Sequence, residues 1–403
     1  MKLTGKTFSL KGKIQNYAWG GYHFIPQLLH IDNKDNKPCA EYWMGAHPSA
    51  PSLVSDGQQS VYLDALIQEF PNETITDPVF QKFGELPYLY KILDVKDMLS
   101  IQVHPTKKEA EKGFDAEEKA GIPINAPHRN YKDKNHKPEV MVALSEFWLL
   151  HGFKHAALLE ATLEDVHEFN KLLPLFKREG YKGLYQFVME MDQEDVDSLL
   201  LPLIQREKRH LEQGLIDKSH PGWWVAKLYK DVEKPVNIDK GVFSIYFFNI
   251  VKANKGEAVF QGAGVPHAYL EGQNVELMAN SDNVLRGGLT PKHIDVPELM
   301  KHTLFEGVTP NVMKGIQIGK NVTQYPCPVP DFGIHKINID NNKFYGETTS
   351  FEIFIAVEGG AVINSSGNWV IKQGEAIAML PGEKYAIEAS GNCVLYKAFV
   401  PEI

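Results

Sequence analysis

The segment KGEAV at residues 255–259 returns as QGEAI at residues 373–377, and the two segments align without a gap. The alignment continues to Gly264, which falls opposite Gly382. Strand-like runs broken by Gly and Pro fill residues 341–403, a pattern typical of an antiparallel β-sandwich or barrel. We therefore predict that the chain contains two copies of one β-barrel unit.

The register of this repeat places His267 opposite Tyr385. The second copy thus has no imidazole at the position where the first copy has one. We predict that only the first copy is equipped for chemistry.

The N-terminal part of the chain alternates apolar runs with turn residues. Residues 86–93, 99–103 and 140–144 are predicted to form short strands. Residues 106–112 are predicted to form a short helix that ends at Gly113. The chain therefore starts with a β-rich unit.

The pattern changes to helical spacing in residues 155–229. From Leu184 to Met191 the apolar residues fall at i, i+3, i+4 and i+7, which gives one apolar stripe on a helix. Aromatic and β-branched residues at 242–251 then predict a return to strand. The helical segment is therefore an insertion in a β-rich chain.

Length and charge exclude several classes of protein. A chain of 403 residues exceeds what one core fills, so two or three units are expected. The net charge of −9 argues against a broad nucleic-acid surface, and an anionic ligand has to meet a local basic pocket. We find neither a signal-peptide core nor a run approaching the roughly 20 apolar residues that span a bilayer. We expect a cytoplasmic protein without nucleic-acid or membrane partners.

The three cysteines lie far apart and show no CxxC spacing. They predict neither a disulfide framework nor a cysteine metal site. Each is interpreted as a small hydrophobic residue.

Polar residues alternate with apolar ones in the segment SIQVH. In a strand this period of two places Ser100, Gln102 and His104 on one face. In the segment KPE the same period puts Lys137 and Glu139 together, at the start of an apolar run. Several polar side chains are therefore expected to line one surface.

A metal site needs lone pairs that converge from several strands. Gln102, His104, Glu139 and His267 offer two imidazole nitrogens and two oxygens. Zinc accepts this donor set readily, whereas calcium favours more oxygens. From spacing alone, a structural role for His267 is the alternative.

The segment NSDNVLRGGLTPK at residues 280–292 is dense in small and polar residues. It can bring the backbone close to a ligand while Arg286 and Lys292 supply positive charge. The alternative is a solvated surface loop.

Taken together, these segments resemble the type I phosphomannose isomerases, a family of double-cupin proteins with a helical insertion. The resemblance covers essentially the whole chain in the family's order, through IQNYAWG (residues 14–20), EYWMG (41–45), LSIQVHP (99–105), NHKPE (135–139), His267 and residues 280–292. It implies a mainly β fold of two cupin-type antiparallel β-barrels plus an α-helical domain.

The resemblance also implies a division of the chain into four segments. They are the first part of a catalytic cupin (residues 1–152), the helical insertion (153–235), the second part of the catalytic cupin (236–325) and a C-terminal cupin-like barrel without a metal site (326–403).

The resemblance further implies a zinc-dependent conversion between mannose 6-phosphate and fructose 6-phosphate through an enediolate. One Zn²⁺ per chain would be held by Gln102, His104, Glu139 and His267, and Arg286 would be an essential active-site arginine. The substrate pocket would be lined by Trp19, Glu41, Ser100, Lys137, Tyr269, Glu276, Asp282 and Lys292.

The proton-transferring base is either Glu276 or Lys137. The pKa of a carboxylate needs only a modest shift for this role, whereas a lysine has to lose its charge through burial or a like-charged neighbour. Glu276 is therefore preferred. Lys292 and Ser100 are expected to contact the phosphate, one by charge and one by a hydrogen bond. The sequence leaves the choice of base open.

Two other functions are compatible with such a chain. A cupin oxygenase would hold non-heme iron with two histidines and one carboxylate, and the fourth ligand Gln102 counts against it. A sugar-binding cupin without activity would have little use for Arg286 beside a metal. We expect a monomer, because internal duplication already buries one barrel against the other.

Overall fold

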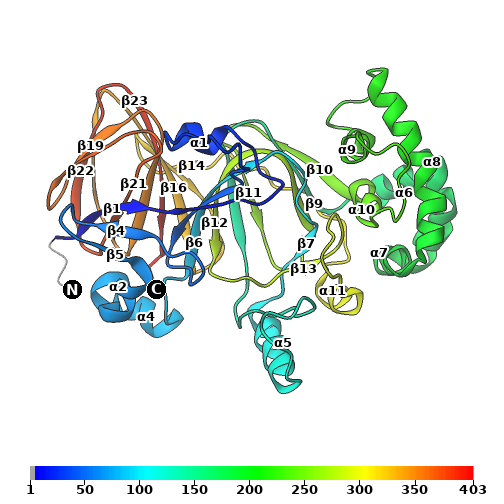
Figure 1. Cartoon of the computed structure of the whole chain (residues 1–403), viewed down its shortest axis with the longest axis horizontal. Helices are drawn as coiled ribbons and strands as arrows, with labels where there is room; N and C mark the ends of the chain where they lie inside the picture. Colours follow the sequence, from blue (N-terminus) through cyan, green and yellow to red (C-terminus); the bar gives the residue numbers. More distant parts are fainter. Residues whose placement is uncertain (1–4, 403) are drawn as a thin grey trace.

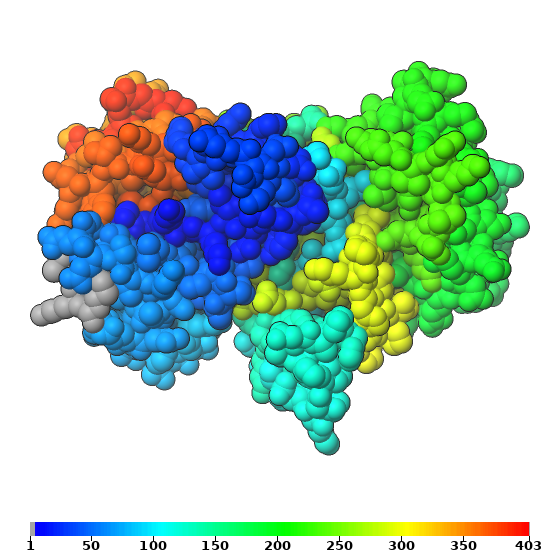
Figure 2. All heavy atoms as spheres, in the orientation of Figure 1, coloured from blue at the N-terminus to red at the C-terminus, as the bar shows by residue number. Residues whose placement is uncertain are grey.

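The structure, a computed structural model, describes residues 5–402. Figure 1 shows an elongated molecule, with C-terminal strands (orange to red) at one end and a group of helices (green) at the other. A large sheet lies between them. In the space-filling view the helix coloured cyan projects from the middle of the body (Figure 2). Within residues 5–402, we find no helix with the length and apolar character needed to cross a membrane.

The central sheet has ten strands, and its pairings are antiparallel. Its main path has the order β10-β9-β12-β6-β3-β2, and four further strands attach beside this path. The strands are β2 (Lys13–Gln15), β3 (Glu41–Gly45), β6 (Tyr88–Val95), β7 (Gln102–Val103), β8 (Glu139–Ala143), β9 (Phe147–Phe153), β10 (Phe248–Ala253), β11 (Ala258–Gln261), β12 (His267–Ala279) and β13 (Leu285–Arg286). The long strand β12 pairs with β6, β7, β8 and β9, so it organises the sheet.

The other two sheets lie in the part of the molecule that is farther from the green helices (Figure 1). The nine-stranded sheet has the order β14-β15-β16-β23-β18-β21-β1-β4-β5, and the four-stranded sheet has the order β17-β22-β19-β20. Their strands are β1 (Thr7–Lys11), β4 (Leu53–Ser55), β5 (Ser60–Tyr62), β14 (Ile316–Gln317), β15 (Val322–Tyr325), β16 (Gly333–Asp340), β17 (Lys343–Glu347), β18 (Glu352–Glu358), β19 (Ala361–Asn364), β20 (Asn368–Ile371), β21 (Ala376–Met379), β22 (Lys384–Glu388) and β23 (Asn392–Phe399). The expectation of a mainly β fold with helices is confirmed.

Strands from both ends of the chain share the nine-stranded sheet. Strand β1 pairs with β21 on one side and with β4 on the other. Strands β1, β4 and β5 of the predicted segment 1–152 therefore lie in a sheet made mostly by the segment 326–403. The division into four segments stays a prediction, and this strand exchange is a feature it did not include.

Helices fill the stretch between β9 and β10. They are α6 (Ala156–Asp165), a 3₁₀ helix (His167–Leu172), α7 (Leu173–Glu190), α8 (Gln193–Glu212), α9 (Pro221–Leu228) and α10 (Gly241–Phe247). The remaining helices are α1 (Phe24–Leu28), α2 (Leu63–Glu69), α3 (Pro71–Ile75), α4 (Asp77–Phe83), α5 (Lys107–Lys119) and α11 (Val296–His302). The core of the helical group includes Ile101 and Val103, so these helices cover the back of β7.

The strand predicted for residues 242–251 is wrong in its first half, because α10 occupies Gly241–Phe247 and β10 begins only at Phe248. Every residue of α10 is buried, and the Phe243 and Phe247 rings contact Phe169 of the 3₁₀ helix. Packing inside the helical core therefore overrides the β-propensity of the aromatic and β-branched residues.

The helix predicted for residues 106–112 does not stop at Gly113, because α5 continues to Lys119. A Cβ atom at Gly113 would lie 2.2 Å from the ring of Tyr131. The glycine is required because this ring packs against the helix backbone, and it does not end the helix. The hydroxyl of Thr106 accepts the N–H of Glu109 and caps the start of the helix.

The two copies of the repeated segment have the same backbone hydrogen bonds. Gly256 donates its N–H to Ala143 at 2.7 Å, and Gly374 donates to Ala356 at 2.7 Å. Both glycines have a positive φ, +86° and +83°, that favours glycine. The repeat read from the sequence is therefore also a repeat in backbone geometry.

The strand pairings extend this equivalence to a carboxylate. Gln261 of β11 lies opposite Glu139, and Met379 of β21, at the same place in the repeat, lies opposite Glu352. The carboxylate of Glu352 is buried and lies 3.0 Å from the ammonium of Lys397. The second copy therefore retains a carboxylate paired with a lysine, as Glu139 is paired with Lys137, but has Tyr385 in place of the imidazole of His267.

Replacing Tyr385 with Phe is expected to leave turnover near the wild-type value, because Tyr385 is buried in the hydrophobic core of the C-terminal strands. The loss of one hydroxyl there costs about 1 kcal/mol of unfolding free energy at most. Steady-state kinetics and thermal unfolding measure both effects. The control is His267→Ala at the equivalent position, which we expect to be inactive. A large loss of turnover in folded Tyr385→Phe would show that the inert copy is misassigned.

Candidate active site

Three buried side chains converge in the ten-stranded sheet, from the end of β7 and the starts of β8 and β12. Nε2 of His104 lies 3.4 Å from Oε1 of Glu139, and Nε2 of His267 lies 3.4 Å from Oε2 of the same carboxylate. One potential ligand atom from each residue lies within 4.8 Å of the others. The group has the spacing of residues that bind one metal ion.

The orientation of both imidazoles is set by backbone carbonyls. Nδ1 of His104 lies 2.9 Å from the Asn283 oxygen, and Nδ1 of His267 lies 2.9 Å from the Val265 oxygen. Because a carbonyl oxygen only accepts, Nδ1 carries the proton in each ring and Nε2 keeps its lone pair. Neither Nε2 atom has a hydrogen-bond partner within residues 5–402. Both rings are therefore held in the form and direction of metal ligands.

Strand register brings Gln102 and Arg286 to the same face. On β7, Gln102 lies opposite His267 of β12 and opposite Arg286 of β13. Residues directly opposite each other in antiparallel strands point to one side of the sheet. Ile101 and Val103 are fully buried on the other side, as the alternation in the sequence predicts. Gln102 is thus available as a fourth ligand, with Arg286 next to it.

The residues present fit a zinc ion. Two imidazole nitrogens, one carboxylate and one amide oxygen form a four-member donor set that zinc accepts, whereas calcium needs more oxygens. Two buried nitrogens without a donor facing them are costly unless a ligand satisfies them. A cation between His104, His267 and Glu139 would satisfy both.

Electrostatics keep these groups in the ligand form. Burial, with the nearby Lys137 ammonium, lowers the pKa of His104 to about 4, so the ring is neutral at neutral pH. Burial acts to raise the pKa of Glu139, but Lys137 and His104 outweigh it and hold this pKa well below the ordinary value. A histidine binds a metal ion as the neutral imidazole, and a glutamate binds it as the ionised carboxylate.

A second charged cluster lies on the same face as Glu139. Glu276 of β12 is two positions from Met278, which is directly opposite Glu139. The ammonium of Lys91 on β6 lies 3.1 Å from Glu276 and 3.5 Å from Glu41 on β3. All of these charged groups are buried. The cluster places a carboxylate, a lysine and a second carboxylate across three neighbouring strands.

The charges of this cluster shift each other's pKa. Burial raises the pKa of Glu276, and Lys91 offsets only part of that effect. Burial acts to lower the pKa of Lys91, but Glu41 and Glu276 outweigh it, so Lys91 stays protonated. Glu276 is therefore a carboxylate with increased proton affinity, as a general base requires.

Lys137, the other candidate base, is bound to a metal ligand. Its Nζ lies 2.5 Å from Oε1 of Glu139, and both side chains are buried. The ammonium thus neutralises and orients the carboxylate.

Aromatic and polar groups surround this centre. Trp19 is half-buried and stacks on Tyr17, with ring centroids 5.9 Å apart. The exposed Asp282 accepts from His47, whose Nε2 lies 3.3 Å from Oδ2. Tyr269 is buried, and burial raises the pKa of its hydroxyl well above the ordinary value.

The segment after β13 carries a second cation, Lys292. Lys292 is exposed, and partial desolvation of its ammonium lowers its pKa, with a smaller contribution from the charge of Arg286. Ser100 is half-buried and lies two positions before Gln102. Within residues 5–402, no hydrogen bond joins the side chains of Ser100, Lys292 or Trp19 to the metal group.

The loop that holds His104 in place is itself anchored. The Asn283 side chain accepts the N–H of Lys132 at 2.7 Å and donates to the Asp133 carbonyl at 2.8 Å. The Asn283 carbonyl accepts the Nδ1–H of His104. The contacts of the Asn283 side chain therefore orient His104, a candidate metal ligand, indirectly.

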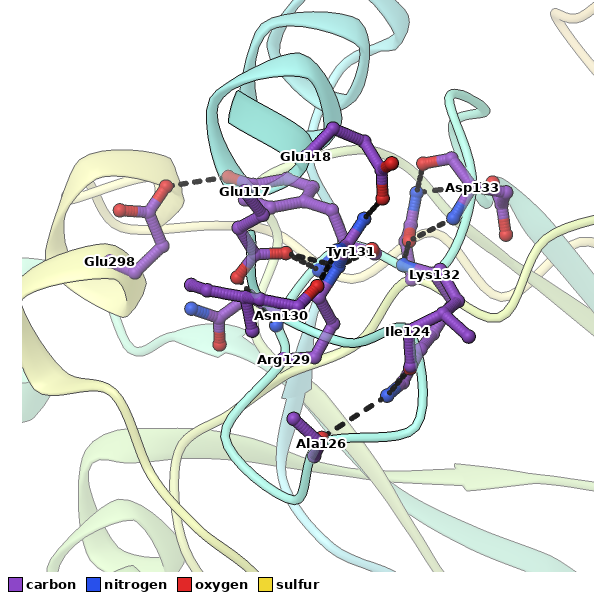
Figure 3. A network of polar contacts seen from close by, with 12 residues as sticks. Glu117, Glu118, Ile124, Ala126, Arg129, Asn130, Tyr131, Lys132, Asp133 and Glu298 are labelled. Atoms are coloured by element: carbon purple, nitrogen blue, oxygen red, sulfur yellow. Dashed lines mark hydrogen bonds and ion pairs between the residues drawn. The ribbon is translucent and has the colours of Figure 1, made fainter. Parts of the chain in front are cut away.

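A larger polar network supports this anchor (Figure 3). The guanidinium of Arg129 lies 2.9 Å from Glu117 and 2.7 Å from Glu118, both on α5. The hydroxyl of Tyr131 donates to Glu298 of α11 at 2.6 Å. Helices α5 and α11 thereby fix the segment that leads to Lys132 and Asp133.

Three contributors were not predicted from the sequence: Lys91, His47 and Asn283. Lys91 interrupts an otherwise mostly apolar strand, and a charge at a buried strand position was the signal that could have found it. Asn283 acts through its backbone carbonyl, which no side-chain pattern reveals. His47 contacts Asp282 only through the folding of distant segments.

Comparison with known proteins gives a consistent result. A family model described as phosphomannose isomerase type I, catalytic domain, matches residues 7–156. The mannose-6-phosphate isomerase of Escherichia coli K12 is 35% identical over 398 residues, which cover 96% of this chain and 96% of that protein. Mannose-6-phosphate isomerase 1 of Arabidopsis thaliana is 31% identical, over 96% of this chain and 93% of that protein.

Solved structures match over nearly the whole chain. A phosphomannose isomerase variant from Salmonella typhimurium matches with a TM-score of 0.88 and 32% identity, over 99% of this chain and 100% of that chain. The Salmonella typhimurium mannose 6-phosphate isomerase bound to fructose 6-phosphate and zinc matches with a TM-score of 0.85 and 33% identity, over 98% of this chain and 100% of that chain.

Proposed function

Since the chain belongs to the type I phosphomannose isomerase family, we propose that the site formed by His104, Glu139 and His267 interconverts mannose 6-phosphate and fructose 6-phosphate. One observation carries this proposal: two buried imidazole Nε2 atoms without a hydrogen-bond partner face one carboxylate. They do so in a chain that matches mannose-6-phosphate isomerases over 96% of its length. The enzyme is therefore an aldose-ketose isomerase.

Gln102, His104, Glu139 and His267 would hold one Zn²⁺ per chain. The two nitrogens and two oxygens suit zinc, and His104, Glu139 and His267 are buried while Gln102 is half-buried. When bound, zinc supplies Lewis-acid polarisation of the substrate's carbonyl and hydroxyl oxygens.

The reaction moves one proton between the adjacent carbons C1 and C2 and one between their oxygens, through an enediolate. We assign the carbon proton to Glu276, because its carboxylate is buried on the same face as Glu139 and has a raised pKa. Lys91 lies 3.1 Å from this carboxylate and holds its position. Lys137 is the weaker candidate, since its ammonium is already bound to Glu139.

Arg286 would stabilise the negative charge that develops on the enediolate oxygens, because a guanidinium stays charged and offers several donors in one plane. Lys292 and Ser100 would contact the phosphate. The remaining pocket would be lined by Trp19, Glu41, Tyr269 and Asp282.

Glu276→Gln is expected to lower kcat by roughly a hundredfold or more, the usual contribution of a general base. Exchange of the C2 hydrogen of mannose 6-phosphate with deuterated water should fall in parallel. The matched control is Glu271→Gln on the same strand, whose carboxylate instead pairs with Lys218 and Lys227. Retained exchange in Glu276→Gln, together with its loss in a zinc-loaded Lys137→Met protein, would reverse the assignment.

A coupled assay for fructose 6-phosphate formed from mannose 6-phosphate tests the function itself. Turnover should be equal in air and under argon, because the isomerisation consumes no oxygen. Oxygen-dependent consumption would indicate a cupin oxygenase, and binding without turnover would indicate a sugar-binding protein.

We also infer that each copy of the repeat is a cupin-type barrel, with the four segments 1–152, 153–235, 236–325 and 326–403. The equivalent hydrogen bonds of Gly256 and Gly374 support this duplication. Because the chain already contains two such units, we propose that it acts as a monomer in the cytoplasm, which size-exclusion chromatography and cell fractionation would test.

A further inference from the structure

The carboxylate of Asp239 binds three backbone N–H groups from two separate segments. It accepts from Gly241 at 2.7 Å, from Leu289 at 2.8 Å and from Thr290 at 3.0 Å. Gly241 begins α10, whereas Leu289 and Thr290 follow Arg286 in the chain. Asp239 therefore ties the start of α10 to the loop after the active-site arginine. In Figure 2 the yellow segment that includes this loop lies directly against the green helical part.

The loop after Arg286 needs such an anchor, because its backbone is in an unfavourable conformation. Leu289 has a φ of +55°, in the left-handed region that residues with a Cβ atom rarely adopt. Gly288 has a φ of +127°, and a Cβ there would lie 2.5 Å from the Cα of Gly241. The loop thus runs in backbone contact with the start of α10, and the Asp239 carboxylate caps the strained residue.

The other side of the loop is bound to the strand that carries the predicted metal ligand Gln102. Gly287 donates its N–H to the Ile101 carbonyl at 2.9 Å, and Ile101 donates to the Gly288 carbonyl at 3.0 Å. Arg286 itself is paired with Gln102. The backbone at Arg286 is therefore fixed by β7 on one side and, three residues later, by Asp239.

We propose that Asp239 is a positioning residue that sets the direction of the Arg286 side chain toward the reacting oxygens. It acts through the backbone of residues 287–290 and touches no substrate. The same clamp extends toward Lys292, because Thr290 accepts the Lys292 N–H through its hydroxyl at 3.2 Å. This inference rests on the proposed function, since it assigns a partner to the arginine of that reaction.

Asp239→Asn tests the proposal, because its amide oxygen can still accept from Gly241 and Leu289, whereas its NH₂ group faces the Thr290 N–H donor and the negative charge is lost, which weakens the clamp. We expect kcat to fall by roughly ten- to a hundredfold, the scale of a misplaced catalytic group, with a smaller change in KM and an unchanged zinc content of about one per chain.

Asp197→Asn is the matched control. Asp197 caps Asn237 and Ile238 at 2.9 and 2.8 Å, and Asn237 also has a positive φ of +52°. Asp197 thus binds the segment that leads to Asp239, and among residues 5–402 no hydrogen bond or ion pair joins it to residues 287–290. A comparable loss of thermal stability with wild-type kcat is expected, and a kcat loss equal to that of Asp239→Asn would overturn the proposal.

A double-mutant cycle separates positioning from general destabilisation. In the Arg286→Ala background, Asp239→Asn should cause little further loss of kcat, because the group it positions is gone. An equal loss of kcat in both backgrounds, or a wild-type kcat in Asp239→Asn, would overturn the positioning role of Asp239. Neither result would affect the proposed isomerase function, provided that the wild-type protein is active. Absence of fructose 6-phosphate production by the wild type would instead reject the proposed function.

Discussion

Removal of zinc by a chelator is expected to abolish turnover while the protein stays folded. The hydrophobic cores that hold the sheets together consist of apolar side chains and do not include the proposed ligands. Loss of the ion also leaves no isolated buried charge, because Glu139 keeps its partner Lys137 at 2.5 Å. We therefore expect the sheet that carries the metal site to fold without the ion, unlike a zinc finger, which folds only with its metal.

Metal analysis, circular dichroism and the coupled assay measure this result together. Protein purified without added metal should contain about one zinc per chain, as the four-ligand set implies. The chelated protein should keep its circular dichroism spectrum and regain activity when zinc is returned. Full turnover in metal-free protein, or unfolding on chelation, would contradict the prediction.

Arg286→Ala is expected to lower turnover by roughly a hundredfold or more, the scale seen when one preorganised donor is removed. A surface-loop arginine would instead change stability by less than about 0.5 kcal/mol and leave the kinetics alone. Arg286 is half-buried and faces the same side as Gln102, so the structure favours the first outcome. KM should change less than kcat, because the interaction strengthens as charge develops.

Arg286→Lys is the sharper variant. It keeps the charge but loses the planar fork that can bridge two oxygens, so severe impairment is expected. Arg178→Lys is a suitable control, since Arg178 is exposed and, within the described part of the chain, forms its ion pair with Glu179 of the same helix. Near wild-type turnover in Arg286→Lys would mean that charge alone suffices at this position.

The sequence predicted the fold best where local pattern and packing agree. The repeat at 255–259 and 373–377 predicted two copies of one β-barrel unit, and in the structure Gly256 and Gly374 donate equivalent hydrogen bonds and have the same φ region. The strand predicted at 242–251 was wrong over residues 242–247, because propensity describes single residues, whereas α10 is stabilised by burial of all its side chains in the helical core. The helix end predicted at Gly113 was wrong for a related reason, because this glycine makes room for the ring of Tyr131, which is distant in sequence.

The candidate site shows a similar limit. His104, Glu139 and His267 were predicted, and the structure brings them together as one group. The choice between Glu276 and Lys137 needed the contacts of each, because Lys91 beside Glu276 and Glu139 beside Lys137 are brought there by strand pairing. Asp239 carries no sequence signal at all, since it acts on backbone groups of a loop about 50 positions away.

The pairing of β1 with β21 has a consequence for how the chain is made on the ribosome. The hydroxyls of Thr7 and Ser365 hydrogen-bond at 2.8 Å although they are 358 positions apart in sequence. At roughly 5–20 residues per second, about 20 to 70 s pass between synthesis of these two residues. During this interval β1 has its early partner β4 on one side but lacks its C-terminal partner β21 on the other.

Strand β1 therefore presents an exposed edge on the nascent chain, a state prone to wrong pairing. The nine-stranded sheet closes only after β21 has left the exit tunnel, so the last part of the chain completes the folding of the first. Ribosome-bound chains that end before residue 376 should be sensitive to protease near β1, and full-length released chains should not.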